Sequence, residues 1–316
     1  MSEASAGDEL PHVVGPGLSW SESYWFELYD VPSGLGGVAR LDVRPNEGAM
    51  DVALSFFLPD GGFITARHVA AQTGNTALLE AEGVRFAMTE PLRRWRVSYD
   101  GPGHSLGSVG DAGRREAWLK SRFERLIVEL EFTALDAAPA LPESAGVAGF
   151  DQVGRWTGEV WVSGDRYEIQ AHGGRGKTWG LPAVPRLQRR FALDFGDGLA
   201  LSAVETVLDE GRRVHGWIMR DGRTTDVRGI ELATVTAPGS PIQKSFQLDL
   251  VDTGGRRHQI AGDVQHVAPL PGFRGGRDTL LCLGVATAVY DGKTGHGIAE
   301  YLHQLGADGN PLEPVT

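Results

Sequence analysis

The chain has little of several features that mark whole classes of protein, and cysteine is the first of them. Among 316 residues there is one cysteine, Cys282. A single thiol cannot form an internal disulfide, and disulfides are typical of secreted proteins. Cys282 lies in the apolar run TLLCLGVATAV, so we expect an inert, buried thiol. These observations favour a reducing compartment, and we interpret the protein as cytoplasmic.

Positive charge and long apolar runs are also scarce. The 30 Lys and Arg residues are outnumbered by 41 Asp and Glu residues, which gives a net charge of −11. Binding to nucleic-acid phosphates needs a concentrated basic surface, so we expect no nucleic-acid partner. No apolar run reaches the roughly 18–20 residues that span a bilayer, so we expect no membrane span. The opening stretch MSEASAGDELPHVVGPG is acidic and polar, unlike a signal peptide.

Metal-ligand spacing is lacking as well. The nine histidines are scattered, without an H-x-H or H-E-x-x-H pair. Zinc sites usually show such short spacings, often together with cysteine. We therefore expect no metal site and no cofactor.

Glycine, in contrast, is abundant and accompanies alternating patterns. The chain has 44 glycines, about 14% of its residues and roughly twice the average usage. Apolar and polar residues alternate over 52–58, 95–99 and 126–132, and Asp-Gly turns follow two of these runs. Period-two patterning with Asp-Gly turns is typical of antiparallel hairpins. The pattern predicts an all-β protein, with one short helix near residues 114–122.

The distribution of these runs indicates two halves. Residues 1–19 are predicted to be a flexible lead, and the Ala- and Pro-rich stretch 136–146 is predicted to be a linker. The expected domains are then 20–135 and 147–316, each an antiparallel β-barrel or sandwich. A faint internal likeness, between RRWRVSYDG at 93–101 and RRFALDFGDG at 189–198, agrees with two related halves. Further strands are expected at 156–162, 166–171, 190–195, 199–208, 214–220, 245–251, 258–267 and 279–290.

A near match to the phosphate-binding loop occurs at residues 171–178, AHGGRGKT. That loop works only when a helix begins at its lysine, because the first amides of the helix hold the phosphates. The residues that follow, WGLPAVPRLQ, place two prolines where the first turns of such a helix would be. We therefore expect no nucleotide site here.

The same region resembles a known family. The stretch GRWTGEVWVSGDRYEIQAHGGRGKTWG (154–180) is similar to the second-domain signature of the two-domain lipocalin-like superfamily that includes the carotenoid hydratases. Similar features elsewhere are WSESYWFELYDVPSGLGGVARLDVRPNEG (20–48), PLRRWRVSYDG (91–101) and GHGIAEYL (295–302). The resemblance implies two lipocalin-like barrels and a hydrophobic cavity for an isoprenoid, a polyketide or a similar small molecule.

One departure from this family bears on the chemistry. Relatives usually read R-D-H-S-W-G where this chain has Arg175-Gly176-Lys177-Thr178-Trp179-Gly180. The aspartate and histidine are thus replaced by Gly176 and Lys177. If that pair performs acid–base chemistry in relatives, this protein must use other groups or lack the reaction.

Three residues are candidates for acid–base catalysis. Glu205 shares a strand face with apolar residues, so it is either a functional acid with a raised pKa or a partner of a buried arginine. His215 shares a face with Trp217 and is either a titratable pocket group or a core histidine. Lys177 would be an unusual acid if desolvated, although lysines in Gly-rich turns are more often solvated.

Other residues are candidates for contact with the ligand or for structural support. Trp179 is expected to line or plug the cavity floor, and Arg175 is expected to form an ion pair with Glu300. His172 is placed near the cavity mouth. The tryptophans Trp156 and Trp217 offer aromatic faces that tolerate developing positive charge.

The leading hypothesis is a cofactor-independent lyase or cyclase of the hydratase type. It would act on a small hydrophobic unsaturated substrate by protonation and water addition, or by holding the substrate in a reactive fold. The alternative is a carrier that binds a hydrophobic small molecule without chemistry, which the replacement of the Asp–His pair favours. A third reading, a carbohydrate-binding sandwich, fits less well because the tryptophans lie within alternating strands. A homodimer is left open.

Overall fold

The computed structural model describes residues 3–72, 78–136, 138–144 and 146–314, and most of them lie in β-strands. The one α-helix within these ranges, α1 (Arg115–Leu119), falls inside the stretch where a short helix was predicted. Short 3-10 helices occur at Ala6–Glu9, Pro45–Glu47 and Val109–Gly113. The all-β prediction is confirmed. In the described part of the chain, no helix has the length and apolar character needed to cross a membrane.

The chain folds into two compact units. Ser2–Gly107 and Glu116–Pro182 form the N-terminal unit, whereas Ser108–Arg115 and Ala183–Thr316 belong to the C-terminal unit. The chain therefore passes between the units near residue 182, and the linker predicted at 136–146 is not the division. Ala140–Ser144 forms a strand there, and the two strands that follow it complete the first sheet. The Ala- and Pro-rich composition misled the prediction because the backbone of that segment is taken up by strand pairing.

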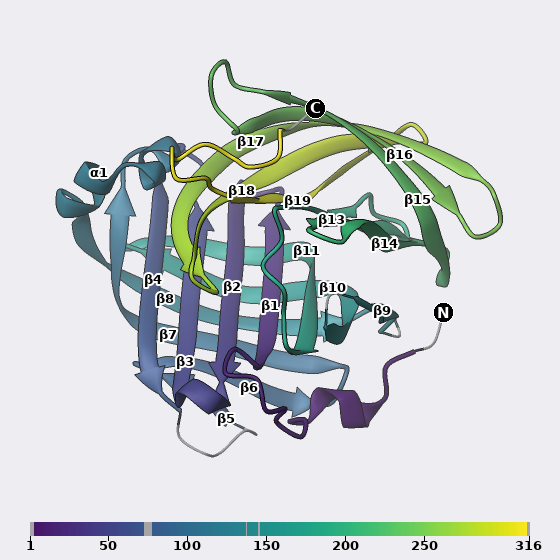
Figure 1. Cartoon of the computed structure of the whole chain (residues 1–316). Coiled ribbons are helices and arrows are strands. Elements are labelled where there is room, and N and C mark those ends of the chain that lie inside the picture. The colour runs from purple at the N-terminus through teal and green to yellow at the C-terminus, as the bar shows by residue number, and fades with distance from the viewer. Residues whose placement is uncertain (1–2, 73–77, 137, 145, 315–316) are drawn as a thin grey trace. The chain divides into compact units, whose positions relative to one another are not determined.

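The N-terminal unit holds one antiparallel sheet of eleven strands (Figure 1). Its strands are β1 (Ser21–Asp30), β2 (Leu35–Arg44), β3 (Ala49–Phe57), β4 (Phe63–Ala71), β5 (Leu78–Ala81), β6 (Val84–Glu90), β7 (Arg94–Leu106), β8 (Arg122–Ala134), β9 (Ala140–Ser144), β10 (Val147–Val162) and β11 (Asp165–Gly180). They lie in the order β4-β3-β2-β1-β11-β10-β8-β7-β6-β5, and β9 pairs with β10. An additional pairing of β4 with β7 makes the sheet ring-like.

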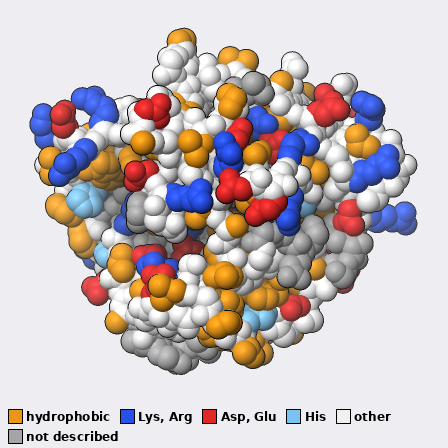
Figure 2. Space-filling model, viewed as in Figure 1, with side chains coloured by type: hydrophobic (Ala, Val, Ile, Leu, Met, Phe, Trp, Pro, Cys, Tyr) orange, Lys and Arg blue, Asp and Glu red, His pale blue; other side chains and the backbone are white. Residues whose placement is uncertain are grey.

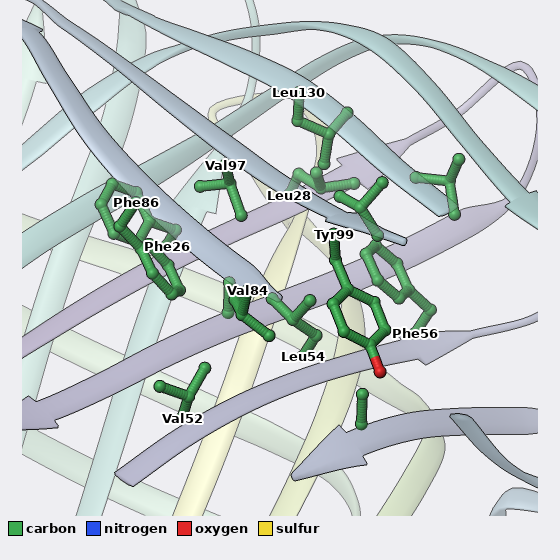
Figure 3. Close-up of a cluster of buried hydrophobic side chains, with 14 of the residues drawn as sticks. Phe26, Leu28, Val52, Leu54, Phe56, Val84, Phe86, Val97, Tyr99 and Leu130 are labelled. Carbon is green, nitrogen blue, oxygen red and sulfur yellow. The ribbon is translucent and has the colours of Figure 1, made fainter. Parts of the chain in front are cut away.

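The inner face of this sheet carries a large hydrophobic core (Figure 3). Alternate residues of the strands, such as Val52, Leu54 and Phe56 on β3, point into the core. Alternation of this kind follows from the period of two in a strand, and it is the pattern seen in the sequence. Tyr99 belongs to this core, and its phenol donates a hydrogen bond to the carbonyl of Pro102 over 2.8 Å.

The C-terminal unit is a closed antiparallel barrel of eight strands in sequence order (Figure 1). They are β12 (Leu187–Asp194), β13 (Leu199–Leu208), β14 (Gly211–Arg220), β15 (Arg223–Thr236), β16 (Gln243–Asp252), β17 (Arg257–Arg274), β18 (Arg277–Tyr290) and β19 (Lys293–Gln304). Phe191, Phe246 and Tyr301 belong to the core inside it. Closure leaves no free sheet edge in the barrel, so each strand pairs on both sides.

The surface is mixed in charge. On the face shown in Figure 2, acidic and basic side chains lie next to one another. Exposed ion pairs such as Arg125–Asp100 and Arg166–Glu159 join neighbouring strands. Each pair of this kind contributes little to stability because water screens the charges.

Candidate functional site

The residues singled out from the sequence fall in three separate places. Arg175, Lys177 and Trp179 lie on β11 in the N-terminal unit, Glu205 points into the closed barrel, and His215 points outward from it. Trp156 lies in the packed core of the N-terminal unit, where its indole N–H donates to the carbonyl of Glu27 over 3.0 Å. His172 lies on β11 opposite Tyr29.

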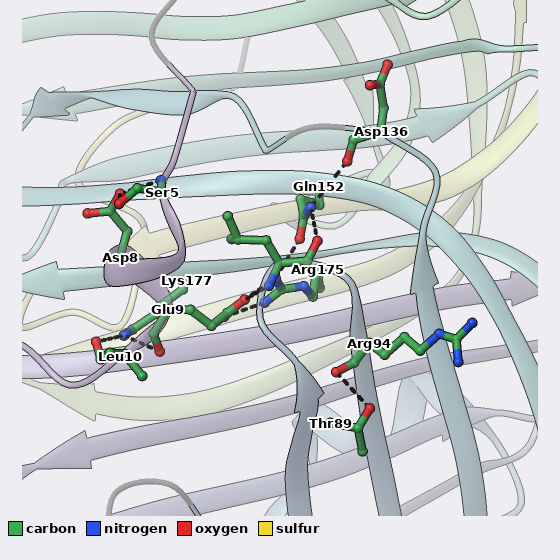
Figure 4. Close-up of polar contacts among 11 residues, drawn as sticks. Ser5, Asp8, Glu9, Leu10, Thr89, Arg94, Asp136, Gln152, Arg175 and Lys177 are labelled. Carbon is green, nitrogen blue, oxygen red and sulfur yellow. Dashed lines mark hydrogen bonds and ion pairs between the residues drawn. The ribbon is translucent and has the colours of Figure 1, made fainter.

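Arg175 is the centre of a buried ion pair with the start of the chain (Figure 4). Its two terminal nitrogens donate to the two carboxylate oxygens of Glu9 over 2.8 and 2.6 Å, and both side chains are fully buried. Gln152 accepts a further hydrogen bond from the guanidinium. The guanidinium lies 5.2–5.8 Å from the ring centroids of Trp95, Phe132 and Phe150. The predicted pairing of Arg175 with Glu300 is wrong, because Glu9 takes that place.

Lys177 donates to the same segment at the start of the chain and to Glu22 on β1. Its ammonium donates to the backbone carbonyls of Glu9 and Leu10 over 3.2 and 2.7 Å and pairs with the Glu22 carboxylate over 3.2 Å. Burial lowers its pKa, and the charge of Glu22 partly opposes this effect. All three donors are thus occupied by protein acceptors. The geometry supports a structural anchor better than the proton donor that we predicted.

Trp179 packs against the same segment. The imidazole of His12 stacks on its indole, with ring centroids 3.8 Å apart and planes at 9°. Nδ1 of His12 lies 3.0 Å from the Glu22 carboxylate. Residues 3–19 are therefore bound to the N-terminal unit through Glu9, Leu10 and His12. This differs from the flexible lead that the sequence suggested, because the partners of these residues lie far away in the sequence.

Gly176 explains part of the departure from the family pattern. A Cβ atom at this position would lie 2.2 Å from the ring of Trp25 and 2.7 Å from a carboxylate oxygen of Asp151. An aspartate could not fit there without moving that indole. The replacement at 176 is therefore coupled to the packing of Trp25.

Glu205 is the partner of two arginines inside the barrel. One carboxylate oxygen accepts from Nε of Arg189 over 2.5 Å, and the other accepts from Nε of Arg212 over 2.5 Å. Arg212 also donates to the carbonyl of Ile230. Of the two predicted roles, the geometry supports the ion pair over the proton donor, because both oxygens already accept from cations.

The outer face of the barrel brings three of the predicted residues together. Glu300, Arg190, Val204 and His215 are directly opposed across β19, β12, β13 and β14. In the neighbouring row, Trp217 lies opposite Ser202. Neighbouring strands lie roughly 4.7–4.9 Å apart, so the first row spans roughly 14 Å from Glu300 to His215, and with the neighbouring row it forms one elongated patch. We call the patch formed by His215, Trp217, Ser202, Arg190 and Glu300 the outer patch.

The chemistry of the outer patch depends on His215 and Trp217. Burial, with a smaller effect of the Arg190 charge, lowers the pKa of His215 to about 4, so the ring is neutral at pH 7. Within the described residues, the ring has no hydrogen-bond partner. The buried indole N–H of Trp217 is likewise unpaired there. A neutral base and a free donor on one largely buried face are groups that can serve a bound molecule.

Several interacting residues were missed from the sequence. Glu9 and His12 lie outside any periodic pattern or motif, and nothing within the stretch 20–48 distinguishes Glu22, so only the structure shows that these residues bind β11. Asp252, His258 and Tyr290 come from three strands of the barrel and meet near one of its ends.

The sequence also contains Gly103-His104-Ser105-Leu106-Gly107, a match to the G-x-S-x-G elbow. The structure places all but the last of these residues within β7 instead of at a turn from a strand to a helix. It therefore lacks the context that the elbow needs.

A ring-like antiparallel sheet followed by a closed antiparallel barrel is the fold expected of two-barrel lipocalin-like proteins, and comparisons with known proteins agree with this fold. The family described as "Domain of unknown function (DUF7064)" matches residues 5–305, and the chain belongs to this family. No curated protein matches.

Solved structures share the fold at low sequence identity. An AttH candidate from Nitrosomonas europaea matches with a TM-score of 0.62 at 13% identity, covering 92% of this chain and 99% of the other. Kievitone hydratase from Nectria haematococca matches with a TM-score of 0.62 at 14% identity, covering 96% of each chain. CghA matches with a TM-score of 0.56 at 12% identity, covering 92% of this chain and 90% of the other. The resemblance to the lipocalin-like superfamily is confirmed at the level of the fold.

Proposed function

We propose that the protein is a cofactor-independent lyase of the hydratase or cyclase type that acts on a small hydrophobic unsaturated molecule. The observation that carries the proposal is the pair formed by His215 and Trp217. Both side chains belong to the outer patch, and each has a nitrogen without a protein partner among the described residues. The likeness of the fold to a hydratase supports this choice.

The proposed chemistry assigns one step to each group of the outer patch. Glu300, which is 5% exposed, is the carboxyl group of this patch and the proposed source of the proton added to an alkene carbon. The indole face of Trp217 stabilises the carbocation that forms. His215, neutral at pH 7, lies three strand spacings from Glu300, so it then accepts a proton at the other end of an extended substrate, from the attacking water or, when the product is cyclic, from carbon.

The alternative is a carrier for a hydrophobic molecule. Its supporting observation is that two of the predicted acids are fully engaged, Lys177 by three acceptors and Glu205 by two arginines. In a carrier, the unpaired groups of His215 and Trp217 would orient a ligand that leaves unchanged.

The test is incubation with a panel of unsaturated isoprenoids and polyenes in heavy-oxygen water. Native mass spectrometry reports binding, and chromatography with mass detection reports products. Incorporation of heavy oxygen establishes hydration, whereas an unchanged mass with a new retention time establishes cyclisation or isomerisation. Binding of panel members without any product contradicts the enzyme and supports the carrier.

Two variants then test whether the reaction takes place at the outer patch. His215→Gln and Glu300→Gln should each lower turnover by about 100-fold or more while binding persists. Gln259→Ala, at an exposed position on β17 of the same barrel, is the matched control and should have unchanged turnover. Full turnover in His215→Gln would exclude the proposed base.

A further inference from the structure

Four polar side chains meet near the end of the barrel where the β14–β15, β16–β17 and β18–β19 turns lie. The phenol oxygen of Tyr290, the last residue of β18, is 2.5 Å from Nδ1 of His258 on β17. Nε2 of the same imidazole is 3.0 Å from the carboxylate of Asp252 on β16. Arg220 on β14 donates to the phenol oxygen over 3.1 Å. Tyr290, His258 and Asp252 are each at most 7% exposed.

The carboxylate fixes how the imidazole is protonated. Burial alone would raise the pKa of Asp252, but hydrogen bonds from His258 and from the backbone N–H of Arg256 lower it overall. Asp252 is therefore an acceptor, and Nε2 of His258 carries the hydrogen that it donates. In the neutral ring, Nδ1 is then the acceptor, and it faces the O–H of Tyr290. The phenol thus has a base in hydrogen-bond contact, and a third group orients that base.

Arg220 supplies the complementary charge. Its side chain is 35% exposed, and its guanidinium pairs with Asp291 over 3.0 Å and lies 5.6 Å from the centroid of the Tyr290 ring. When the phenol gives its proton to His258, the negative charge left on its oxygen is adjacent to this cation. Arg220 also connects the buried phenol to the solvent-facing rim of the barrel.

We propose that Tyr290 is a base-activated nucleophile and that this end of the barrel is a second reactive centre, able to accept an acyl group from a small ester. The phenol oxygen bonds to the acyl carbon, and the bond from that carbon to the leaving alkoxide breaks. The phenol proton passes to Nδ1 of His258, Asp252 stabilises the imidazolium, and the imidazolium then gives this proton to the alkoxide, which leaves as the alcohol. A nucleophile bonded to a base that a third group orients is the general arrangement of this chemistry.

Another tyrosine of the same barrel provides a contrast. Tyr301 is fully buried, and its hydroxyl is bonded to the Thr234 hydroxyl over 2.7 Å. Burial raises its pKa to about 12. Tyr301 therefore lacks the activation that surrounds Tyr290, and it should remain unmodified.

The proposal is independent of the outer patch, because none of its four residues belongs to that patch. The probe is p-nitrophenyl acetate, which is small and releases p-nitrophenolate as it transfers its acetyl group. Peptide mass spectrometry of the full-length protein locates the acetyl group, and the colour of p-nitrophenolate gives the rate. We expect acetylation of Tyr290 to be at least about tenfold faster than that of Tyr167, a half-buried tyrosine on β11.

Variants distinguish activation of the Tyr290 phenol by His258 from simple exposure of that phenol to the probe. Tyr290→Phe keeps the ring that packs on Phe195 and should lose the label. His258→Asn and Asp252→Asn remove the base and the group that orients it, so each should slow acetylation of Tyr290 by tenfold or more. If the array only held the barrel end together, the same changes would expose the phenol and speed its labelling.

The outcomes are distinct. Labelling of Tyr290 that depends on His258 and Asp252 supports the proposal. Labelling of Tyr290 at the rate of Tyr167, or labelling that becomes faster in His258→Asn, overturns it. Circular dichroism of each variant establishes that it is folded. If His258→Asn does not fold, Asp252→Asn and Tyr290→Phe still decide the question.

Discussion

Glu9 and Arg175, which are 166 positions apart in the chain, form a fully buried, two-pronged ion pair. The pair attaches the first turn of the described chain to β11, the strand that carries the family signature. Burying two charges is costly unless each is paired, so removing one partner has a large effect. The first prediction concerns this pair.

Glu9→Gln should lower the free energy of unfolding by about 3–5 kcal/mol, because it leaves the guanidinium of Arg175 buried without an anion. Urea unfolding followed by tryptophan fluorescence measures the change. Glu47→Gln, which breaks the exposed pair of Glu47 with Arg44, is the control and should cost at most about 1 kcal/mol. Equal losses of unfolding free energy in the two variants would mean that the buried pair contributes no more to stability than the exposed pair.

Glu205→Gln should also destabilise the protein, by about 3–5 kcal/mol, because Arg189 and Arg212 both lose their anion. The ion pairs with Arg189 and Arg212 assign Glu205 a structural role. Each folded molecule of the variant should therefore have the same turnover as the native protein. The measurement is turnover of the folded fraction at a temperature well below its unfolding midpoint. A loss of turnover of 100-fold in a fully folded variant would restore the catalytic role first predicted from the sequence.

His303 should make the stability fall in acid. Burial, with a smaller effect of the Arg189 charge, lowers its pKa to about 4, and its ring nitrogens have no partner among the described residues. The unfolded chain binds this proton at its ordinary pKa of about 6.5, so it gains a proton before the folded chain does. Stability is therefore full above pH 6.5 and falls as the pH drops toward 4, by up to roughly 3 kcal/mol. Unfolding midpoints at pH 7.5 and 4.5 should differ less in His303→Phe than in the native protein; an equal difference would exclude His303 as a cause.

Gly176→Ala should lower stability by about 1–3 kcal/mol, because the new methyl group overlaps the ring of Trp25. Trp25→Phe removes the overlapping part of the indole, so the double variant should recover part of the loss. Gly107→Ala is the control, because a Cβ there has open space. Thermal unfolding of the native protein, the two single variants, the double variant and the control measures these effects, and additive losses in the double variant would contradict the packing explanation.

Cys282 should be unreactive in the folded protein. It is fully buried, and burial raises the pKa of its thiol to about 12. A thiol-reactive dye should therefore label the native chain only after denaturant is added, whereas Ser5→Cys, at an exposed position, should react at once. Rapid labelling of Cys282 in the native protein would show that the barrel opens under native conditions.

Much of the strand pattern was predictable because alternation is a local property. Residues 199–208 were predicted as a strand from their apolar alternation, and β13 has these same bounds. The alternation also placed Glu205 on the face of Leu201 and Ala203, which is the inside of the barrel. His215 and Trp217 were likewise placed on one face, and the register confirms this.

The remaining features depend on contacts between distant parts of the chain. No pattern in residues 3–19 shows that Glu9 pairs with Arg175, because a single acidic residue in a polar stretch has no periodicity. Likewise, strand spacing does not reveal that His258 lies between Asp252 and Tyr290. The linker predicted at 136–146 failed for the same reason, because its residues are held by pairing with β10.

The position of β11 has a consequence for how the protein is made. β1 pairs with β2 on one side and with β11 on the other, from Ser21 opposite Gly180 to Tyr29 opposite His172. During synthesis, one edge of β1 therefore stays open until nearly the whole N-terminal unit has left the ribosome. An unpaired strand edge is a site of aggregation, and pairing between distant segments is slow. Growing chains should thus be prone to aggregation until β11 has emerged and paired with β1.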